Sequence, residues 1–371
     1  MTGRELLLNT LHGGARDRLT WATYIDGTAR ASLPQREREM PLLDVYRQMG
    51  CDIMQWGNGG LEEHQRFHPG YRMVSPHVQV RVERLPDGSA VTHRDTDWGT
   101  LTAVSRSGHP VKQPVTSVQE VAVLRRIWES MRYEPVGEPD GFAPAFAAIG
   151  EDGILSQTMS PSPMQLLIQL ETGIEGFYYL LADHRREMEA LLEIMHARRL
   201  EEYRIALSRS QADVIIPVEN TSSTLTSPAV YERYGMPQVR DYVEIIHAHG
   251  KVAVLHMCGL LSHLLPVIAR TELDGINALT PAPVGDTPFD EALDVLGEDL
   301  VILGGVFPPE VLHRTSLTAG ELARTLDAIY TPRVRRSRFL LCLGVDGLRV
   351  DLDRFEMFRR WFEANGAITA V

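Results

Sequence analysis

A histidine and a cysteine two residues apart are the strongest candidates for chemistry in this chain. His256 and Cys258 lie in the segment LHMCG (255–259), directly after the apolar run KVAVLH (251–256). Alternate residues of a strand point to the same face, so an imidazole nitrogen and a thiolate could meet one ion there. Zinc accepts both ligands, at about 2.0–2.3 Å. The structural alternative is a buried cysteine beside a hydrogen-bonded histidine.

Three further side chains could complete such a site. Cys342, in RFLLCL (338–343), is predicted to be a third zinc ligand, or else a small apolar residue of a buried strand. Glu219, in PVENTSS, could be a fourth ligand, a hydrogen-bond partner of His256 or a general acid. Asp26, in YIDG, is a candidate acid, and a turn-forming Asp-Gly pair is its structural alternative.

Alternating strands and helices must position these residues. Short apolar runs alternate with helical patterns along the chain, which is typical of a parallel sheet with helical crossovers. Eight such units close into a (β/α)8 barrel, whose active sites form at the carboxyl ends of the strands. The predicted strands are 20–25, 51–56, 153–158, 213–218, 251–256, 274–279, 300–304 and 338–343. Their carboxyl ends carry Asp26, Trp56, Glu219, His256 with Cys258, and Cys342.

One segment interrupts the alternation of strands and helices. Residues 72–105 alternate with a period of two and contain the turn sequence Pro-Asp-Gly-Ser at 86–89. This pattern predicts an antiparallel hairpin inserted after the second strand. We therefore expect a single α/β domain over residues 1–371, a (β/α)8 barrel with an inserted β-hairpin.

Composition excludes several classes of protein. The net charge of −12 disfavours a nucleic-acid partner. No apolar stretch approaches the roughly 20 residues that span a bilayer, and the amino-terminal segment lacks the pattern of a signal peptide. Three cysteines are too few for a disulfide framework. We expect a cytoplasmic protein that binds neither nucleic acid nor membrane.

Several motifs together resemble the uroporphyrinogen decarboxylase superfamily, which includes zinc-dependent cobalamin methyltransferases and related demethylases. The resemblance extends over nearly the whole chain. The segments that carry it are DRLTW (17–21), GCDI (50–53), WGTL (98–101), PVTSVQEV (114–121), SPSPMQLL (160–167), GIEGFYYLLADHRREM (173–188), SPAVYERYGMP (227–237), HAHGKVAVLHMCG (247–259), DGINALTPAPVGD (274–286) and LVILGGV (300–306).

The resemblance to the methyltransferase branch implies a particular metal site and partner. In that branch a His-x-Cys pair and a later cysteine hold zinc, which implies His256, Cys258 and Cys342 here, with Glu219 as a rival third ligand. Such enzymes move a methyl group between a small molecule and a corrinoid. This chain has no Asp-x-His-x-x-Gly signature of corrinoid binding. The corrinoid (cobalamin) is therefore expected on a partner protein.

Two other functions remain open from the sequence. A metal-independent decarboxylase or lyase on the same barrel would use Asp26 or Glu219 as its acid. The substrate-binding arginine pair of the true uroporphyrinogen decarboxylases is missing, because the corresponding position reads TYIDGTAR (23–30). A binding protein without catalysis is the third hypothesis. The residues favour the zinc-dependent methyltransferase or demethylase over both.

Overall fold

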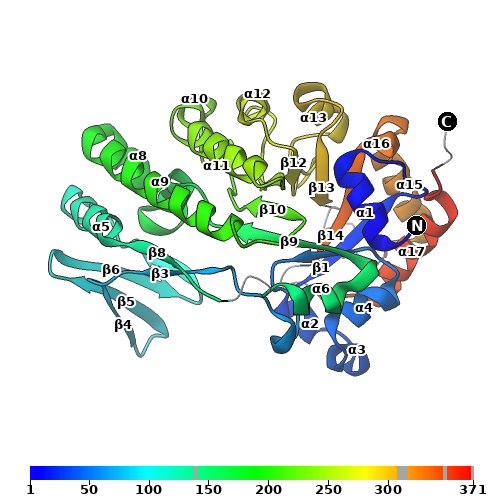
Figure 1. Cartoon of the computed structure of the whole chain (residues 1–371), viewed down its shortest axis with the longest axis horizontal. Coiled ribbons are helices and arrows are strands. Elements are labelled where there is room, and N and C mark those ends of the chain that lie inside the picture. The colour runs from blue at the N-terminus through cyan, green and yellow to red at the C-terminus, as the bar shows by residue number, and fades with distance from the viewer. Residues whose placement is uncertain (138–140, 307–315, 346–348, 369–371) are drawn as a thin grey trace.

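Eight parallel strands form a sheet that curves into a nearly closed barrel, as predicted. The computed structural model describes residues 1–137, 141–306, 316–345 and 349–368 (Figure 1). The strand order is β1-β14-β13-β12-β11-β10-β9-β2, and every ladder in it is parallel. All eight predicted strands are present, with ends that differ by at most two residues. They are β1 Thr20–Ile25, β2 Ile53–Trp56, β9 Gly153–Met159, β10 Val214–Pro217, β11 Val252–His256, β12 Gly275–Asn277, β13 Val301–Val306 and β14 Arg338–Val345.

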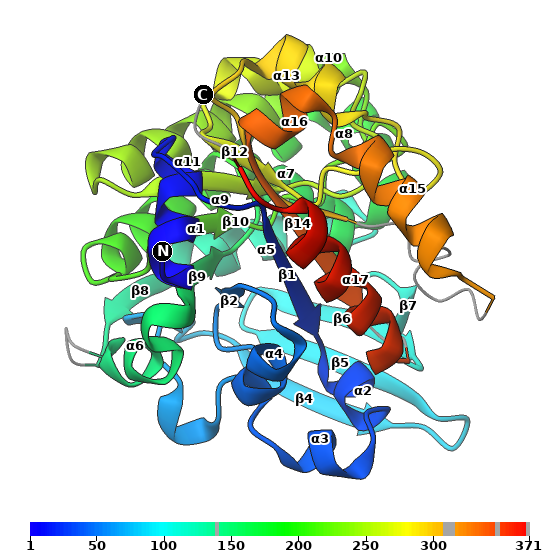
Figure 2. The ribbon, with the colours of Figure 1, turned by 90° about the vertical axis from the view of Figure 1, so that its right-hand side faces the viewer.

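Helices surround the barrel and connect its strands (Figure 2). Two π-helical turns, Leu167–Glu171 and Tyr231–Gly235, interrupt the crossovers that follow β9 and β10. The helices of the described residues are α1 Gly3–His12, α2 Gly27–Ala31, α3 Gln35–Glu39, α4 Leu42–Met49, α5 Val118–Ser130, α6 Ala143–Ile149, α7 Pro163–Leu166, α8 Gly173–Asp183, α9 Arg185–Leu207, α10 Pro228–Val230, α11 Met236–Ala248, α12 Leu265–Ile268, α13 Phe289–Leu296, α15 Ala319–Ile329, α16 Pro332–Arg336 and α17 Leu352–Asn365. None of these is long and apolar enough to cross a membrane.

The barrel strands bury both faces, which explains their continuous apolar sequences. One set of strand residues fills the barrel interior together with two leucines of α1. The alternate set packs against the surrounding helices. The interior set includes Leu7, Leu11, Ala22, Met54, Ile154, Ile216, Val254, Leu303 and Leu340. The outer set includes Trp21, Ile53, Leu155, Ile215, Leu255, Ile276 and Leu341.

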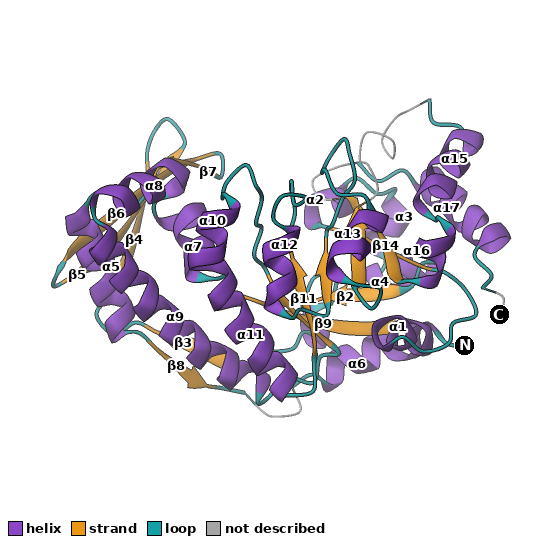
Figure 3. Cartoon of the chain, turned by 90° about the horizontal axis from the view of Figure 1, so that it is seen from above, coloured by secondary structure: helices purple, strands orange, loops and turns teal. Residues whose placement is uncertain are grey.

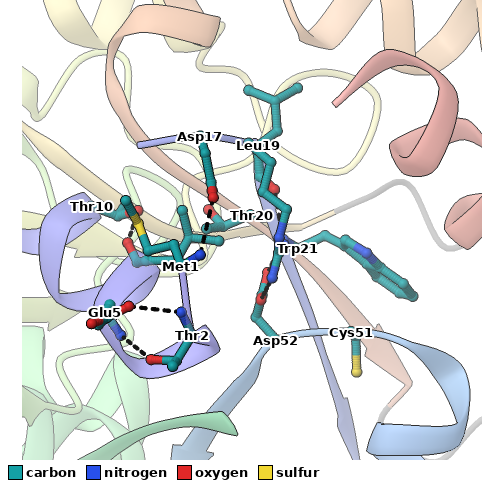
Figure 4. A network of polar contacts seen from close by, with 12 residues as sticks. Met1, Thr2, Glu5, Thr10, Asp17, Leu19, Thr20, Trp21, Cys51 and Asp52 are labelled. Carbon is teal, nitrogen blue, oxygen red and sulfur yellow. Dashed lines mark hydrogen bonds and ion pairs between the residues drawn. The ribbon is translucent and has the colours of Figure 1, made fainter. Parts of the chain in front are cut away.

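An aspartate bridges the seam between β1 and β2, which share no ladder in the sheet order. The Asp52 carboxylate accepts a 3.2 Å hydrogen bond from the Trp21 backbone N–H, and the Asp52 N–H donates to the Trp21 carbonyl at 2.8 Å (Figure 4). Arg18 donates to both oxygens of the same carboxylate, at 3.0 and 2.5 Å. The Asp52 side chain is 2% exposed. The contacts of Asp52 thus join β1 to β2, whereas backbone ladders join the other neighbouring strands of the barrel.

The insertion after β2 is larger than the predicted hairpin. An antiparallel sheet of four strands, β4 Gln79–Arg84, β5 Ser89–Thr96, β6 Gly99–Arg106 and β7 His109–Lys112, takes its place. A further strand, β3 Tyr71–Val74, pairs with β8 Arg132–Pro135 rather than with this sheet. The predicted turn at 86–89 does join β4 to β5. The predicted hairpin is only part of the insertion, because two more tight turns, at 97–98 and 107–108, continue the meander.

The four-stranded sheet lies on the opposite side of the molecule from the barrel's amino- and carboxyl-terminal helices (Figure 3). Helix α5 packs on β6 and on α9, and so connects the sheet to the crossover that follows β9. The partly buried ion pair between Arg94 of β5 and Glu171 provides a second connection. The insertion is therefore attached to one flank of the barrel.

We predict that Asp52→Asn lowers the free energy of unfolding by about 2–4 kcal/mol, because it places an amide N–H against Arg18 inside the seam. Urea denaturation measures the change. The matched control is Asp17→Asn, since Asp17 is half exposed and pairs with the Met1 amino group at 3.3 Å on the protein surface (Figure 4). That control should cost less than about 1 kcal/mol. Equal effects of the two substitutions would contradict the role of Asp52.

Candidate active site

A cavity of about 430 Å³ opens at the carboxyl ends of the barrel strands. Its volume lies within the usual range of small-molecule sites. None of its described lining residues carries a full charge. They are Tyr24, Trp56, Gly57, Asn58, Gly59, Thr158, Val218, His256, Asn277, Ala278, Gly304, Cys342 and Gly344. The described wall is thus uncharged and contains one imidazole and one thiol.

The alternation of strand residues explains which side chains reach this cavity. Residues two positions beyond an interior core residue point into the barrel as well. Ala22, Met54, Val254 and Leu340 belong to the interior core. The residues two positions further on are Tyr24, Trp56, His256 and Cys342, and all four line the cavity.

Asn277 holds the His256 ring in one orientation. The Nδ1 atom of His256 lies 2.5 Å from Oδ1 of Asn277, and the two residues are paired across β11 and β12. The Asn277 amide nitrogen donates to the Leu303 carbonyl, which fixes the amide with its oxygen toward the imidazole. In the neutral ring this contact assigns the proton to Nδ1 and the lone pair to Nε2. This is the arrangement usual for histidines that bind a metal or accept a proton.

A glycine makes this hydrogen bond sterically feasible. Gly304 has a φ of +77°, and a Cβ atom there would lie 2.4 Å from Nδ2 of Asn277 and 3.1 Å from Cβ of Cys342. Any other residue would displace the amide from the Leu303 carbonyl. The irregularity in the β13–β14 ladder between Leu303 and Gly305 lies at the same point. Gly304 thus makes room for Asn277.

Aromatic rings form the side of the cavity next to the seam. The rings of Trp56 and His256 meet edge to face, with centroids 5.7 Å apart, and Tyr24 meets Trp56 at 6.5 Å. Tyr24 comes from β1 and Trp56 from β2, so the seam that Asp52 bridges also sets the distance between these rings. The wall can pack against an apolar part of a ligand.

Cys258 does not line this cavity, although it follows His256 by two residues. Strand β11 ends at His256, and the chain turns before the next inward position. The exposed Cys258 thiol donates instead to Oδ1 of Asn220 at 3.4 Å. The Cys258 side chain is therefore adjacent to the barrel mouth but outside the described wall of the cavity.

Glu219 faces away from the cavity because it is the residue after an inward-facing one. Val218 lines the cavity, and Glu219 points to the opposite side, where it is completely buried. Its carboxylate accepts from the Ser162 N–H at 2.6 Å and from the Ser162 hydroxyl at 2.9 Å. Its own N–H donates to the His256 carbonyl. Glu219 thus contacts the backbone of His256 and not its ring.

Burial raises the pKa of Glu219 to about 7, against the opposing effects of the Ser162 hydrogen bonds and of Arg199. Asp26, the other candidate acid, accepts a 2.6 Å hydrogen bond from the Ala29 N–H and caps helix α2. Asp26 thus begins a helix, whereas its structural alternative was a turn-forming Asp-Gly pair. Neither carboxyl group lines the cavity.

The described residues contain no group of three His, Cys, Asp or Glu side chains close enough to hold a metal ion. Of the predicted ligands, the cavity wall brings together His256 and Cys342, while Cys258 and Glu219 lie outside it. The oriented imidazole and the thiol nevertheless match the donor chemistry of zinc.

Sequence analysis missed Asn277, Tyr24 and Thr158 as lining residues. Asn277 had a detectable signal, because DGINAL places a lone amide within an otherwise apolar strand. Tyr24 and Thr158 could have been found from the alternation of interior residues along β1 and β9. Tyr24 precedes the last residue of β1 by one position, and Thr158 precedes the last residue of β9 by one position.

Comparisons with known proteins agree with this architecture. The family model described as uroporphyrinogen decarboxylase (URO-D) matches residues 157–346, slightly more than half of the chain. A solved methyltransferase from Methanosarcina mazei has a TM-score of 0.57 at 13% identity, covering 98% of this chain and 99% of that one. At that identity the likeness shows a shared fold. A structure named for an orotidine 5'-phosphate decarboxylase of Streptomyces avermitilis has a TM-score of 0.24 at 15% identity over 57% of this chain and 89% of that one, which carries no weight. No curated protein matches the chain by sequence.

We predict that Asn277→Ala releases the His256 ring from its single tautomer. In the wild type, nitrogen NMR of labelled histidine should show His256 protonated at Nδ1 when neutral. The variant should show a mixture in which the Nε2–H form, favoured in free imidazole side chains, increases. Asn58→Ala is the matched control, because Asn58 lines the same cavity but bonds to the Phe67 backbone. An unchanged tautomer in Asn277→Ala would contradict the role of Asn277.

We predict that Glu219→Gln changes the pH dependence of stability. Between about pH 4.5 and 7 the unfolded wild type loses the Glu219 proton while the folded state keeps it, so the wild type loses stability as the pH rises through this window. The glutamine variant lacks this loss. Its stability relative to the wild type should therefore rise by about 3 kcal/mol from pH ~4 to pH ~8. Parallel curves of unfolding free energy against pH would contradict the assignment.

Proposed function

Because the chain belongs to the uroporphyrinogen decarboxylase family, we propose that it transfers a methyl group between a small molecule and a corrinoid carried by a partner protein, with zinc at the barrel mouth. The observation that carries the proposal is the fixed His256 imidazole. Its Nδ1 atom is held by Asn277, so that Nε2 would be the nitrogen that binds the metal, in a wall whose described residues carry no full charge. The fold shared with the methyltransferase from Methanosarcina mazei supports the same proposal.

In this proposal His256, Cys258 and Cys342 hold the metal. His256 and Cys342 share the cavity wall, and Cys258 follows at the barrel mouth. Glu219 is the weaker candidate, since Ser162 already donates to both of its oxygens. Bound zinc would act as a Lewis acid toward a leaving group, or would hold a thiol substrate as its thiolate.

The chain's own residues would bind and orient the small substrate. The rings of Tyr24 and Trp56 offer a surface for its apolar part. Asn58 and Thr158 offer polar groups, and the cavity of about 430 Å³ excludes most of the bulk water from a molecule of this size. The mouth of the barrel is the face that a separate corrinoid protein would have to approach.

The described wall of the cavity does not suit a substrate with many carboxylates. Uroporphyrinogen is such a substrate, and its binding requires cationic groups. No arginine or lysine is among the described lining residues. Asp26 and Glu219, the acids of the decarboxylase alternative, are engaged by Ala29 and Ser162. The pocket therefore favours transfer of a small group over decarboxylation of a tetrapyrrole.

We predict about one zinc per chain in protein purified without chelator, measured by elemental analysis. His256→Ala, Cys258→Ala and Cys342→Ser should each reduce zinc affinity at least about tenfold, since a site with three protein ligands loses one of them. Cys51→Ser is the matched control, because Cys51 does not line the cavity and its thiol donates to the Tyr46 carbonyl at 3.5 Å. It should retain zinc.

The outcomes distinguish the ligand sets and the function. Unchanged zinc affinity in Cys342→Ser would remove Cys342 from the set and leave Glu219 as the third ligand to test by Glu219→Gln. Metal-free wild type with no zinc affinity would contradict the metal-dependent proposal. Methyl transfer itself is tested by mixing zinc-loaded enzyme with methylcobalamin as the methyl donor and a series of small thiols as acceptors. The loss of the visible absorption of methylcobalamin measures the reaction.

A further inference from the structure

A second cavity of about 460 Å³ lies between the barrel and the inserted strands. Its wall comes from β3, β4, β5, α5, β8, α9 and the segment after β9. It shares no lining residue with the cavity at the barrel mouth. The lining residues are Tyr71, Met73, Ser75, Val78, Val80, Arg94, Ile127, Trp128, Met131, Tyr133, Ser160, Leu166, Glu171, Arg199 and Glu202. The proposed methyl transfer assigns no role to this place.

Both carboxylates in the wall already accept hydrogen bonds from the protein. Glu202 accepts from the Tyr71 hydroxyl, from the Ser160 hydroxyl at 2.9 Å and from Nη1 of Arg199. Glu171 accepts from Arg94 through both of its oxygens. Each carboxylate is thus paired with an arginine, so the described wall carries no net negative charge that would attract a cation.

The Arg199 guanidinium, in contrast, has unused donors. The residue is 3% exposed, and its Nε atom has no hydrogen-bond partner among the described residues. Only Nη1 is bonded to Glu202, whereas a guanidinium carries five N–H groups. Its plane lies over the ring of Trp128, with Cζ 5.8 Å from the centroid. A buried guanidinium with spare donors selects for an acceptor, above all a carboxylate.

The rest of the wall is apolar and aromatic. The rings of Tyr71 and Tyr133 meet edge to face at 5.5 Å, and methionine, valine and leucine side chains complete the surface. We propose that this cavity binds an apolar carboxylic acid, with the carboxylate on Arg199 and the hydrocarbon body against Tyr133, Trp128 and the inserted strands. Such a ligand would join the barrel to the insertion, because α9 belongs to the barrel and β4 to the inserted sheet.

Isothermal titration of the full chain with 3-phenylpropanoate tests the proposal, and 3-phenylpropan-1-ol is the matched neutral probe. The acid should bind about tenfold or more tightly than the alcohol, because only the acid forms charge-assisted hydrogen bonds with Arg199. Arg199→Lys should reduce the affinity for the acid and leave that for the alcohol unchanged. His256→Ala should leave both unchanged, which separates this site from the proposed zinc site.

A second pair of variants avoids the buried ion pair. Val80→Trp should fill the cavity and abolish binding of the acid. Val82→Trp is its matched control, since Val82 lies on the same face of β4, has a similar exposure (57% against 65%) and is not a lining residue. Equal affinity for acid and alcohol, or undiminished binding by Val80→Trp, would overturn the proposal. Loss of binding in His256→Ala would also overturn it, because the acid would then occupy the barrel mouth.

Discussion

Closure of the barrel depends on one buried carboxylate. Strands β1 and β2 share no ladder. In its place, the Asp52 carboxylate beside β2 accepts hydrogen bonds from the Trp21 backbone N–H and from Arg18, which both lie near the start of β1. A buried carboxylate is tolerated there because several donors satisfy it. The strands on either side of this seam carry Tyr24 and Trp56, so the same interaction fixes the aromatic wall of the cavity. The geometry of the candidate active site, at the carboxyl ends of β1 and β2, thus depends on the contact between Asp52 and Trp21 at the amino-terminal ends of the same two strands.

The sequence was sufficient for the barrel because its strands are buried on both faces. Continuous apolar runs bounded by turn residues identified all eight strands, and burial leaves such runs few alternatives. The positions of His256 and Cys342 at strand ends also placed both residues at one mouth. Whether these two residues bind zinc remains a prediction. The sequence could not reveal Asn277 as their neighbour, because that contact requires the pairing of β11 with β12 and the absence of a side chain at Gly304.

The positions of Cys258, Glu219 and the inserted sheet show where periodicity fails as a guide. Periodicity applies only while the strand continues, and β11 ends at His256, before Cys258. Glu219 lies one residue past inward-facing Val218, so its carboxylate turns outward. In the insertion, Pro-Asp-Gly-Ser was an obvious turn, but Ser107 and Gly108 form another with φ values of 50° and 82°. A Ser-Gly pair predicts a turn less strongly than Pro-Asp-Gly-Ser does, and the long alternating pattern next to it predicts a continuous strand.

The segment after β9 connects the two cavities physically. Ser162 donates to Glu219, which is bonded through its backbone to His256 at the barrel mouth. Ser160, two residues earlier, donates to Glu202 in the wall of the second cavity. Arg199 adds a favourable charge to both, since it pairs with Glu202 and opposes the rise in the pKa of Glu219. A ligand carboxylate on Arg199 would offset that positive charge and so favour the protonated form of Glu219. Binding of a ligand in the second cavity would then change the charge of Glu219 in the segment that supports the barrel mouth.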